Sequence, residues 1–183
     1  VMALVREAVT LSGLEGLGVP QVLAFGRLPR SARRWLVREL VEGRSLEQVF
    51  AALPTGNGGL DWLVPLAGAA DQLTVLHRAG LLHGDIKPAN VIVGPAGEGT
   101  LVDLGLATPW KEGGARARGL TPKYAAPELL MGEPLTVRAE VYALGATLRD
   151  GLVERRTDLD DATFEALQKI ADRATADNPQ DRF

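Results

Sequence analysis

The chain has 183 residues, of which 46% are apolar and 23% charged, a composition typical of one globular domain with a hydrophobic core. Lys and Arg total 20 against 23 Asp and Glu, so the net charge is −3, and cysteine is absent. These values argue against nucleic acid as the main partner and exclude disulfides, cysteine-ligated zinc and thiol catalysis. No apolar run is long enough for a membrane segment and no signal-peptide pattern opens the chain, so we expect a cytoplasmic protein.

The first 40 residues predict one helix and a hairpin. Apolar residues recur at helical spacing from Leu4 to Leu14, which predicts a helix over 2–16. Two short β-type runs follow, Val22–Phe25 and Trp35–Val37. The polar, Arg-rich residues between them suit the turn of a hairpin.

Two further helices are expected before residue 80. The first covers 45–53, with Ser45 as its N-cap. A turn over 54–59 leads to the second, which runs from Asp61, as its cap, to about Ala79.

The second half of the chain changes from strands to helices. Short β-branched runs alternate with polar residues between 81 and 106. Helical patterning then returns over 127–131, 136–150 and 161–175. We therefore expect an α+β fold in which mixed strands come first and helices follow.

A polar stretch between two of the predicted strands contains the residues with the clearest chemistry. It reads His-Gly-Asp-Ile-Lys-Pro-Ala-Asn over 83–90 and is followed by Asp-Leu-Gly over 103–105. Taken singly, Asp, Asn and Gly are ordinary turn residues. Together, two carboxylates and a carboxamide offer the oxygen ligands that Mg²⁺ prefers, and Lys87 offers a positive charge to a phosphoryl group. Phosphoryl transfer needs these groups and a carboxylate that orients the attacking hydroxyl.

At this point the sequence resembles the catalytic domain of a protein kinase, most closely the bacterial, Hanks-type serine/threonine kinases. HGDIKPANVIV resembles the catalytic loop, DLG the metal-binding DFG, TPKYAAPELL the segment that ends in A-P-E, and VYALGATL the helix after it. NPQDRF resembles a late arginine motif, VREAVTLSGLEGLGVPQVLAFG the regulatory helix with its following strand, and RWLVRELVEGRSLEQVF the hinge. The matches cover nearly the whole chain in the family's order.

The resemblance implies one kinase-like domain over 1–183. Residues 1–40 would form a partial small lobe, a helix plus two strands, together with the hinge. Residues 41–183 would form the mainly helical large lobe. The implied function is transfer of the γ-phosphate of ATP to Ser or Thr hydroxyls of protein substrates, with ATP and Mg²⁺ as cofactors.

The same resemblance implies roles for residues of the catalytic loop and its surroundings. Asp85 would be the catalytic base and Lys87 would steady the γ-phosphate. Asn90 and Asp103 would hold Mg²⁺, and Thr121 would help to form the pocket for the acceptor residue.

Three further residues would bind the adenine. Glu39 and Val41 would offer hinge backbone groups to the ring, and Ile92 would lie beneath it.

Other matching positions would be structural. Glu128 and Arg182 would form a buried ion pair. An apolar spine linking the lobes would be formed by Leu11, Val22, His83 and Leu104. His83 is therefore expected to be a packing residue, and His77 a satisfied histidine at a helix end.

The sequence departs from the family pattern at several positions. No Gly-rich loop and no lysine precede Lys87, so Glu7 lacks its expected strand lysine and truncation is the simplest explanation. Gly84 stands in place of an Arg that receives an activation-loop phosphate. Glu140 replaces an Asp that holds the catalytic-loop backbone, and its extra methylene puts that hydrogen bond in question. Arg38 occupies the usually apolar gatekeeper position.

Two alternatives stay open beside the serine/threonine kinase. A small-molecule phosphotransferase of the aminoglycoside or choline kinase kind also uses an H-G-D loop, but those relatives lack the A-P-E segment and a Lys two residues after the Asp. A non-catalytic, kinase-like binding module is the other, and for these 183 residues alone we expect no catalysis.

Overall fold

The computed structural model describes residues 2–16, 18–52 and 60–183. Its helices are α1 (Met2–Ser12), α2 (Leu46–Ala51), α3 (Leu63–Arg78), α4 (Pro127–Leu130), α5 (Val137–Glu154) and α6 (Asp161–Ala174). Its strands are β1 (Val22–Arg27), β2 (Arg34–Arg38), β3 (Arg44–Ser45), β4 (Leu81–Leu82), β5 (Val91–Val93), β6 (Gly99–Leu101) and β7 (Thr108–Pro109). None of the described helices is both long and apolar enough to cross a membrane.

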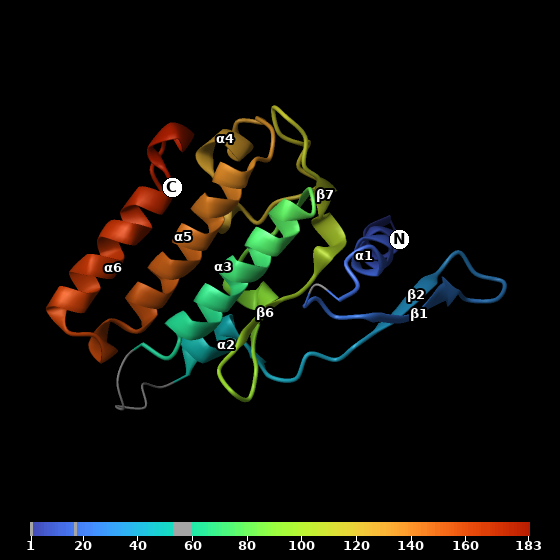
Figure 1. The fold of residues 1–183 in the computed structure, drawn as a ribbon, viewed down its shortest axis with the longest axis horizontal. Coiled ribbons are helices and arrows are strands. Elements are labelled where there is room, and N and C mark those ends of the chain that lie inside the picture. Colours follow the sequence, from blue (N-terminus) through green and yellow to red (C-terminus); the bar gives the residue numbers. More distant parts are fainter. Residues whose placement is uncertain (1, 17, 53–59) are drawn as a thin grey trace.

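The molecule has a small part and a larger helical part (Figure 1). The small part contains α1 and the β1–β2 hairpin, and the helical part contains α3, α5 and α6 lying side by side. Between them lie two small antiparallel sheets, the three-stranded β3–β5–β6 and the two-stranded β4–β7. The expected α+β fold, with a partial small lobe and a mainly helical large lobe, is confirmed.

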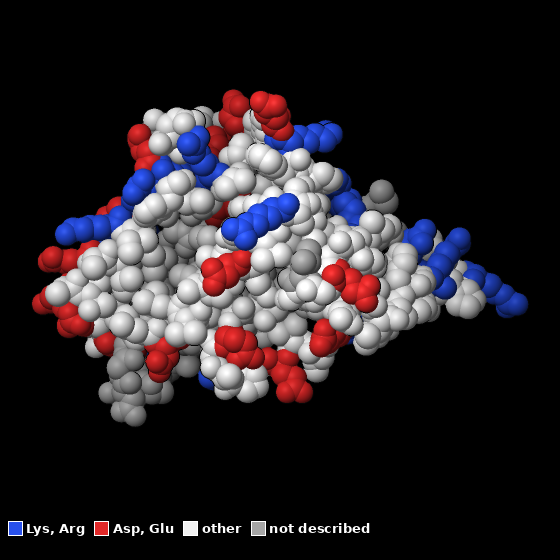
Figure 2. Space-filling view, viewed as in Figure 1, with Lys and Arg blue, Asp and Glu red and all other residues white. Residues whose placement is uncertain are grey.

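The small part follows the sequence pattern closely. Helix α1 ends at Ser12, earlier than the predicted 16, and buries Ala8 and Leu11. β1 and β2 pair antiparallel as predicted, each slightly longer than its apolar run. Figure 2 shows basic side chains at the tip of this hairpin and acidic side chains along the lower edge of the same face.

One of the two expected helix caps is correct and the other is wrong. Ser45 accepts a hydrogen bond from Gln48 N at 3.2 Å, and the Gln48 side chain returns one to Ser45 N, which completes a capping box. Helix α3 instead begins after Trp62, whose helical backbone (φ −71°, ψ −15°) differs from the extended backbone of a side-chain cap. Asp61 therefore lies one residue outside the cap position. The turn expected over 54–59 lies outside the described residues.

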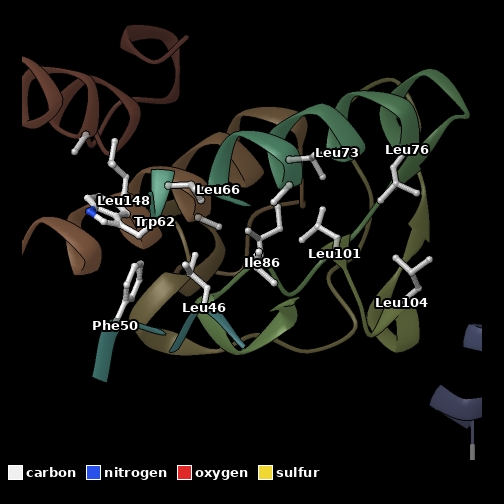
Figure 3. Close-up of a cluster of buried hydrophobic side chains, with 14 of the residues drawn as sticks. Leu46, Phe50, Trp62, Leu66, Leu73, Leu76, Ile86, Leu101, Leu104 and Leu148 are labelled. Atoms are coloured by element: carbon white, nitrogen blue, oxygen red, sulfur yellow. The ribbon is translucent and has the colours of Figure 1, made fainter. Parts of the chain in front are cut away.

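The core lies where α2, α3 and α5 meet the β5–β6 pair (Figure 3). Phe50 and Trp62 pack edge to face, with ring centroids 5.6 Å apart. Gly151 of α5 lies directly under the indole, since a Cβ there would fall 2.4 Å from a ring carbon of Trp62. This core fixes α3 and α5 against the strands that carry the polar loops.

The helices after residue 126 agree with the predicted segments. Helix α5 continues to Glu154, four residues beyond the predicted end at 150. Asp160 caps α6 by accepting a hydrogen bond from Thr163 N at 2.9 Å. Helices α5 and α6 pack side by side and form one flank of the molecule (Figure 1).

Candidate active site

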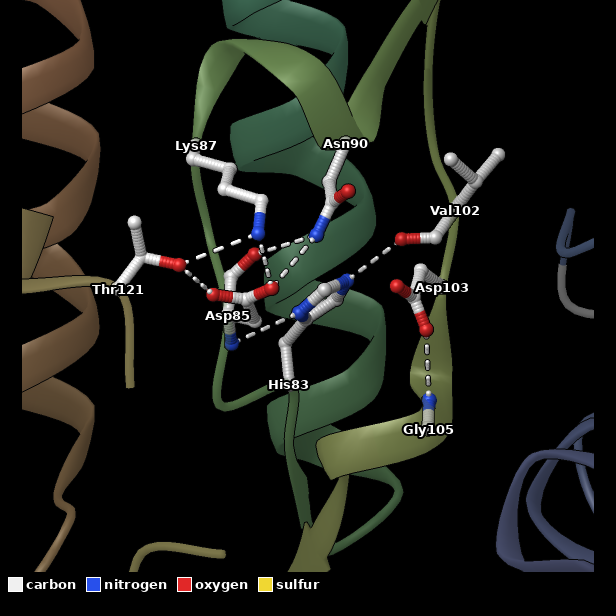
Figure 4. Close-up of polar contacts among 8 residues, drawn as sticks. All are labelled: His83, Asp85, Lys87, Asn90, Val102, Asp103, Gly105 and Thr121. Atoms are coloured by element: carbon white, nitrogen blue, oxygen red, sulfur yellow. Dashed lines mark hydrogen bonds and ion pairs between the residues drawn. The ribbon is translucent and has the colours of Figure 1, made fainter. Parts of the chain in front are cut away.

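Strand pairing brings the two polar segments of the sequence together. The loop after β4 enters a 3₁₀ turn, Pro88–Asn90, and continues into β5, which pairs antiparallel with β6. Val102 N donates to Asn90 O at 3.0 Å, so the pairing extends one residue beyond β6. Asp103 follows immediately, and the structure thus places it beside the loop that carries Asp85 (Figure 4).

The carboxylate of Asp85 is the centre of a hydrogen-bond network (Figure 4). Lys87 Nζ donates to its Oδ2 at 2.6 Å, and Asn90 Nδ2 donates to the same oxygen at 3.1 Å. Thr121 Oγ1 donates to Oδ1 at 2.7 Å and lies 3.1 Å from Lys87 Nζ. Residues from the loop and from the segment before α4 therefore converge on one carboxylate.

This network also sets the charge state of Asp85. Burial acts to raise its pKa, but the hydrogen bonds from Lys87 and Thr121 and the positive charge of Lys87 outweigh burial. The pKa of Asp85 consequently lies below its usual range. The group is an ionised acceptor at neutral pH, as a residue that orients a hydroxyl must be.

Asp103 and Asn90 present oxygen atoms suited to a hard cation. Asp103 adopts a left-handed backbone (φ 66°), uncommon for a non-glycine residue, and its Oδ1 accepts from Gly105 N at 3.2 Å. Asn90 is buried and donates its amide protons to Asp85 O and Oδ2, which leaves its carboxamide oxygen as the remaining acceptor. One carboxylate and one amide oxygen fit Mg²⁺, which keeps several waters and phosphate oxygens as further ligands.

A small cavity opens beside Asp85. Its lining includes Gly84, Asp85, Leu120, Thr121 and Glu140. Thr121 and Asp85 both line it, and the Thr121 hydroxyl points at the carboxylate (Figure 4). A hydroxyl-bearing side chain placed here would lie within reach of Asp85.

The expected adenine contacts lie on the connection between β2 and β3. Glu39 N already donates to Gln21 O at 2.8 Å, so of its backbone groups only the carbonyl is available to a ligand. Val41 is half-buried on the same connection, and Ile92 is half-buried on β5. Gly43 holds this connection close to β5, since a Cβ there would lie 2.1 Å from Val93 O and 3.0 Å from an Ile92 methyl.

His83 does more than pack. Its side chain is fully buried, and its Nδ1 accepts from Asp85 N at 3.2 Å while Nε2 lies 3.2 Å from Val102 O. Burial lowers the pKa of His83, so the neutral ring donates from Nε2 to the carbonyl. The ring thus joins the backbone of Asp85 to the strand that leads into Asp103, a link that sequence reasoning missed. Of the other expected spine residues, Leu11 and Leu104 belong to the buried apolar core, and Val22 packs against that core.

Glu140 makes the hydrogen bond that its extra methylene put in question. It is buried on α5, and its Oε1 accepts from Gly84 N at 2.7 Å. Its Oε2 lies 2.7 Å from Nε2 of His77 at the end of α3. Gly84 has a φ of +84°, and a Cβ there would lie 2.9 Å from Leu106 O. The longer carboxylate therefore connects the end of α3 and the loop that carries Asp85 to α5.

We expect Glu140→Asp to destabilise the fold by about 1–3 kcal/mol, because the shorter side chain cannot reach His77 and Gly84 together and leaves a buried polar group unsatisfied. Urea unfolding measures the change. Glu165→Asp, the same substitution at an exposed position of α6, is the matched control and should change the free energy of unfolding by less than about 0.5 kcal/mol. Equal effects of the two substitutions would show that the contacts of Glu140 with His77 and Gly84 do not stabilise the fold.

Glu7 has a partner in this structure, contrary to the expectation from its missing lysine. Arg38 Nη1 of β2 lies 3.6 Å from Glu7 Oε1. Burial raises the pKa of Glu7, and the nearby charge of Asp103 acts in the same direction, while Arg38 acts against both. Arg38 of β2 is therefore the cation that lies beside this helix glutamate.

Glu128 and Arg182 form a bidentate pair. The Nη1–Oε1 and Nη2–Oε2 distances are 2.6 and 2.8 Å, and the arginine side chain has no exposed surface. Arg182 also donates to backbone carbonyls of Arg138, Ala176 and Asp177. The pair fastens α4 to the C-terminal turn and to α5.

Glu128→Gln should destabilise the protein by about 3–5 kcal/mol, because it removes the countercharge of a fully buried guanidinium while keeping the side-chain volume. The check is chemical denaturation, with Glu165→Gln on exposed α6 as the control. A loss below about 1 kcal/mol would show that the carbonyl partners suffice for Arg182.

Comparison with known proteins agrees with this geometry. The family model described as "Protein kinase domain" matches residues 4–177. The serine/threonine-protein kinases PknJ and PknA of Mycobacterium tuberculosis are 31% and 28% identical over 79% and 89% of this chain. The kinase pkn2 of Myxococcus xanthus is 33% identical over 76% of it. The chain spans 25%, 39% and 18% of the length of these three relatives. The chain therefore belongs to the protein kinase family, as a Hanks-type catalytic domain related to serine/threonine kinases.

Proposed function

We propose that these residues form the catalytic and metal-binding half of an ATP- and Mg²⁺-dependent serine/threonine kinase of bacterial type. The observation that supports this most directly is the convergence of Lys87, Asn90 and Thr121 on the carboxylate of Asp85. Asp103 follows the end of the neighbouring strand. Its Oδ1 accepts from Gly105 N, which leaves Oδ2 for a cation.

In this proposal Asp85 accepts a hydrogen bond from the hydroxyl of a substrate Ser or Thr and orients it toward the γ-phosphate. Lys87, already beside that carboxylate, stabilises the charge on the transferred phosphoryl group. Thr121 helps to position the substrate hydroxyl, because its own hydroxyl is hydrogen-bonded to both Asp85 and Lys87. Most of the rate enhancement then comes from positioning and electrostatics.

Asn90 and Asp103 would hold Mg²⁺, which when bound neutralises phosphate charge. The structure favours this assignment because the Asn90 amide protons are used by Asp85, which directs the carboxamide oxygen away from it (Figure 4). Glu39, Val41 and Ile92 would bind the adenine.

The acceptor distinguishes the proposed function from its main alternatives. A polypeptide containing these residues is incubated with γ-labelled ATP, Mg²⁺ and either a protein mixture or an amino-alcohol and aminoglycoside mixture. We expect label on Ser and Thr only. Label on the small molecules would favour a small-molecule phosphotransferase, and no label with intact nucleotide binding would favour a binding module.

The 183 residues alone should transfer no phosphate above background. They contain no Gly-rich loop and no lysine before Lys87, so one wall of a nucleotide site and its phosphate cation are lacking within them. The measurement is the same labelling assay on the folded chain, with circular dichroism to verify folding. Mg²⁺-dependent transfer by this chain would contradict the prediction.

A further inference from the structure

A second group of polar residues lies outside the proposed catalytic machinery. An open cavity of about 660 Å³ lies between α1, β7 and the segment that follows β7. Four of its lining residues are cations and none is acidic, namely Arg6, Lys111, Arg116 and Arg118. In Figure 1 the segment after β7 runs along the upper edge of the molecule toward α4.

These cations are not neutralised within the described part of the chain. The ion pairs of the described residues involve other Lys and Arg side chains, and the residues outside the described ranges include no Asp or Glu. Glu112 is exposed beside the cavity without lining it, and Glu7 is beside Arg38. In a chain of net charge −3, four unpaired cations around one cavity produce a local positive potential that attracts anions.

One of the four cations is held in place. Arg6 Nε donates to Gly105 O at 3.3 Å, which fixes its side chain over the turn that follows Asp103. Arg116 and Arg118 have no such anchor and are both exposed on the segment after β7. An anion bound among them would therefore join α1 to this segment.

The segment cannot supply the anion itself by phosphorylation. Residues 109–120 include no Ser, Thr or Tyr, and the preceding Thr108 is only 5% exposed. Phosphorylation of residues 109–120 therefore cannot provide the negative charge.

The cavity is close to the proposed acceptor site. Arg118 precedes Thr121 by three residues, which span at most about 11 Å of extended chain. Leu120 and Thr121 line the cavity beside Asp85. An extended substrate advances about 3.3 Å per residue, so side chains roughly three to five residues from its acceptor reach the cations.

We propose that this cavity binds carboxylate side chains of the protein substrate and so selects Ser or Thr acceptors with acidic residues nearby. The assignment of the acceptor site rests on the proposed function. Arginine binds carboxylates through paired, charge-assisted hydrogen bonds, and the positive potential accelerates encounter with acidic segments.

Binding of a labelled peptide tests the cavity without requiring catalysis. The peptide carries one Ser with Glu residues three to five places away on both sides, and its affinity for the 183-residue chain is measured by fluorescence anisotropy. We expect Arg116→Ala/Arg118→Ala to weaken binding at least about tenfold, since two charge-assisted contacts are lost. Arg33→Ala/Arg78→Ala makes the same charge change at exposed positions of the hairpin and α3, and should change the affinity less than about twofold.

Other outcomes would overturn the proposal. They are equal weakening by the two double variants, equal binding of a peptide with Lys in place of Glu, or no peptide binding while inorganic phosphate binds. A second assay then uses an active polypeptide that contains these residues and compares the rates of phosphate transfer to the acidic and neutral peptides. Absence of any Ser or Thr transfer, with peptide binding intact, would refute the proposed function and not the anion site.

Discussion

Asp103→Ala should reduce phosphate transfer to background in any active polypeptide that contains these residues. The substitution removes the only carboxylate among the two proposed Mg²⁺ ligands, and the amide oxygen of Asn90 alone offers no charge to the ion. Loss of the Asp103 side chain should disturb the fold little, because the side chain is exposed and accepts one hydrogen bond, from Gly105 N. Phosphate incorporation at saturating ATP, measured across a range of Mg²⁺ concentrations, is the appropriate assay.

Asp161→Ala is a suitable control for this result, since it removes an exposed carboxylate from the start of α6, remote from the polar loops (Figure 1). It should keep most of the transfer activity. Undiminished transfer by Asp103→Ala would remove the basis for the proposed metal site, whereas equal loss in both variants would indicate a general effect of charge.

Asp85→Asn should lower the rate of transfer by about 10²–10⁴-fold, the usual contribution of a positioned base. The substitution keeps the volume of the side chain but removes the charge that Lys87 neutralises and leaves one acceptor oxygen for the three donors Lys87, Asn90 and Thr121. The loss should appear in kcat, because the hydroxyl is oriented in the transition state and the nucleotide contacts lie elsewhere.

A pH profile separates this role from a structural one. The pKa of Asp85 is lowered mainly by hydrogen bonds from Lys87 and Thr121, so the acidic limb of kcat should move to higher pH in Lys87→Met. In Thr157→Ala, a change in the turn after α5, it should not move. If the acidic limb of the kcat profile is unchanged in Lys87→Met, a group other than Asp85 is responsible for that limb.

The fold was largely accessible from sequence because its elements are locally specified. The 3.6-residue repeat from Leu4 to Leu14 and the Ser45 cap each depend on residues a few positions apart. The Asp61 cap was wrong for a related reason, since a favourable cap residue is only a local preference. Burial of Trp62 in the core accompanies a helix start one residue later.

Parts of the candidate site depend on contacts between distant residues, which spacing does not reveal. Sequence indicated Asp85, Asn90 and Asp103 because they lie in compact motifs. It did not indicate that Arg38 lies beside Glu7, 31 positions away, or that His77 reaches Glu140, 63 positions away. Those pairs arise only when α1 packs on β2 and α3 on α5.

The backbone of Gly84 has an evolutionary consequence. With φ at +84° and the Leu106 carbonyl 2.9 Å from a would-be Cβ, an arginine cannot enter at this position unless the neighbouring loop moves as well. Its N–H is also committed to Glu140. A single mutation toward the arginine of other kinases would therefore be selected against on stability alone, whatever it offered in regulation. An arginine at position 84 is therefore expected only in a lineage in which the loop that carries Leu106 has changed as well.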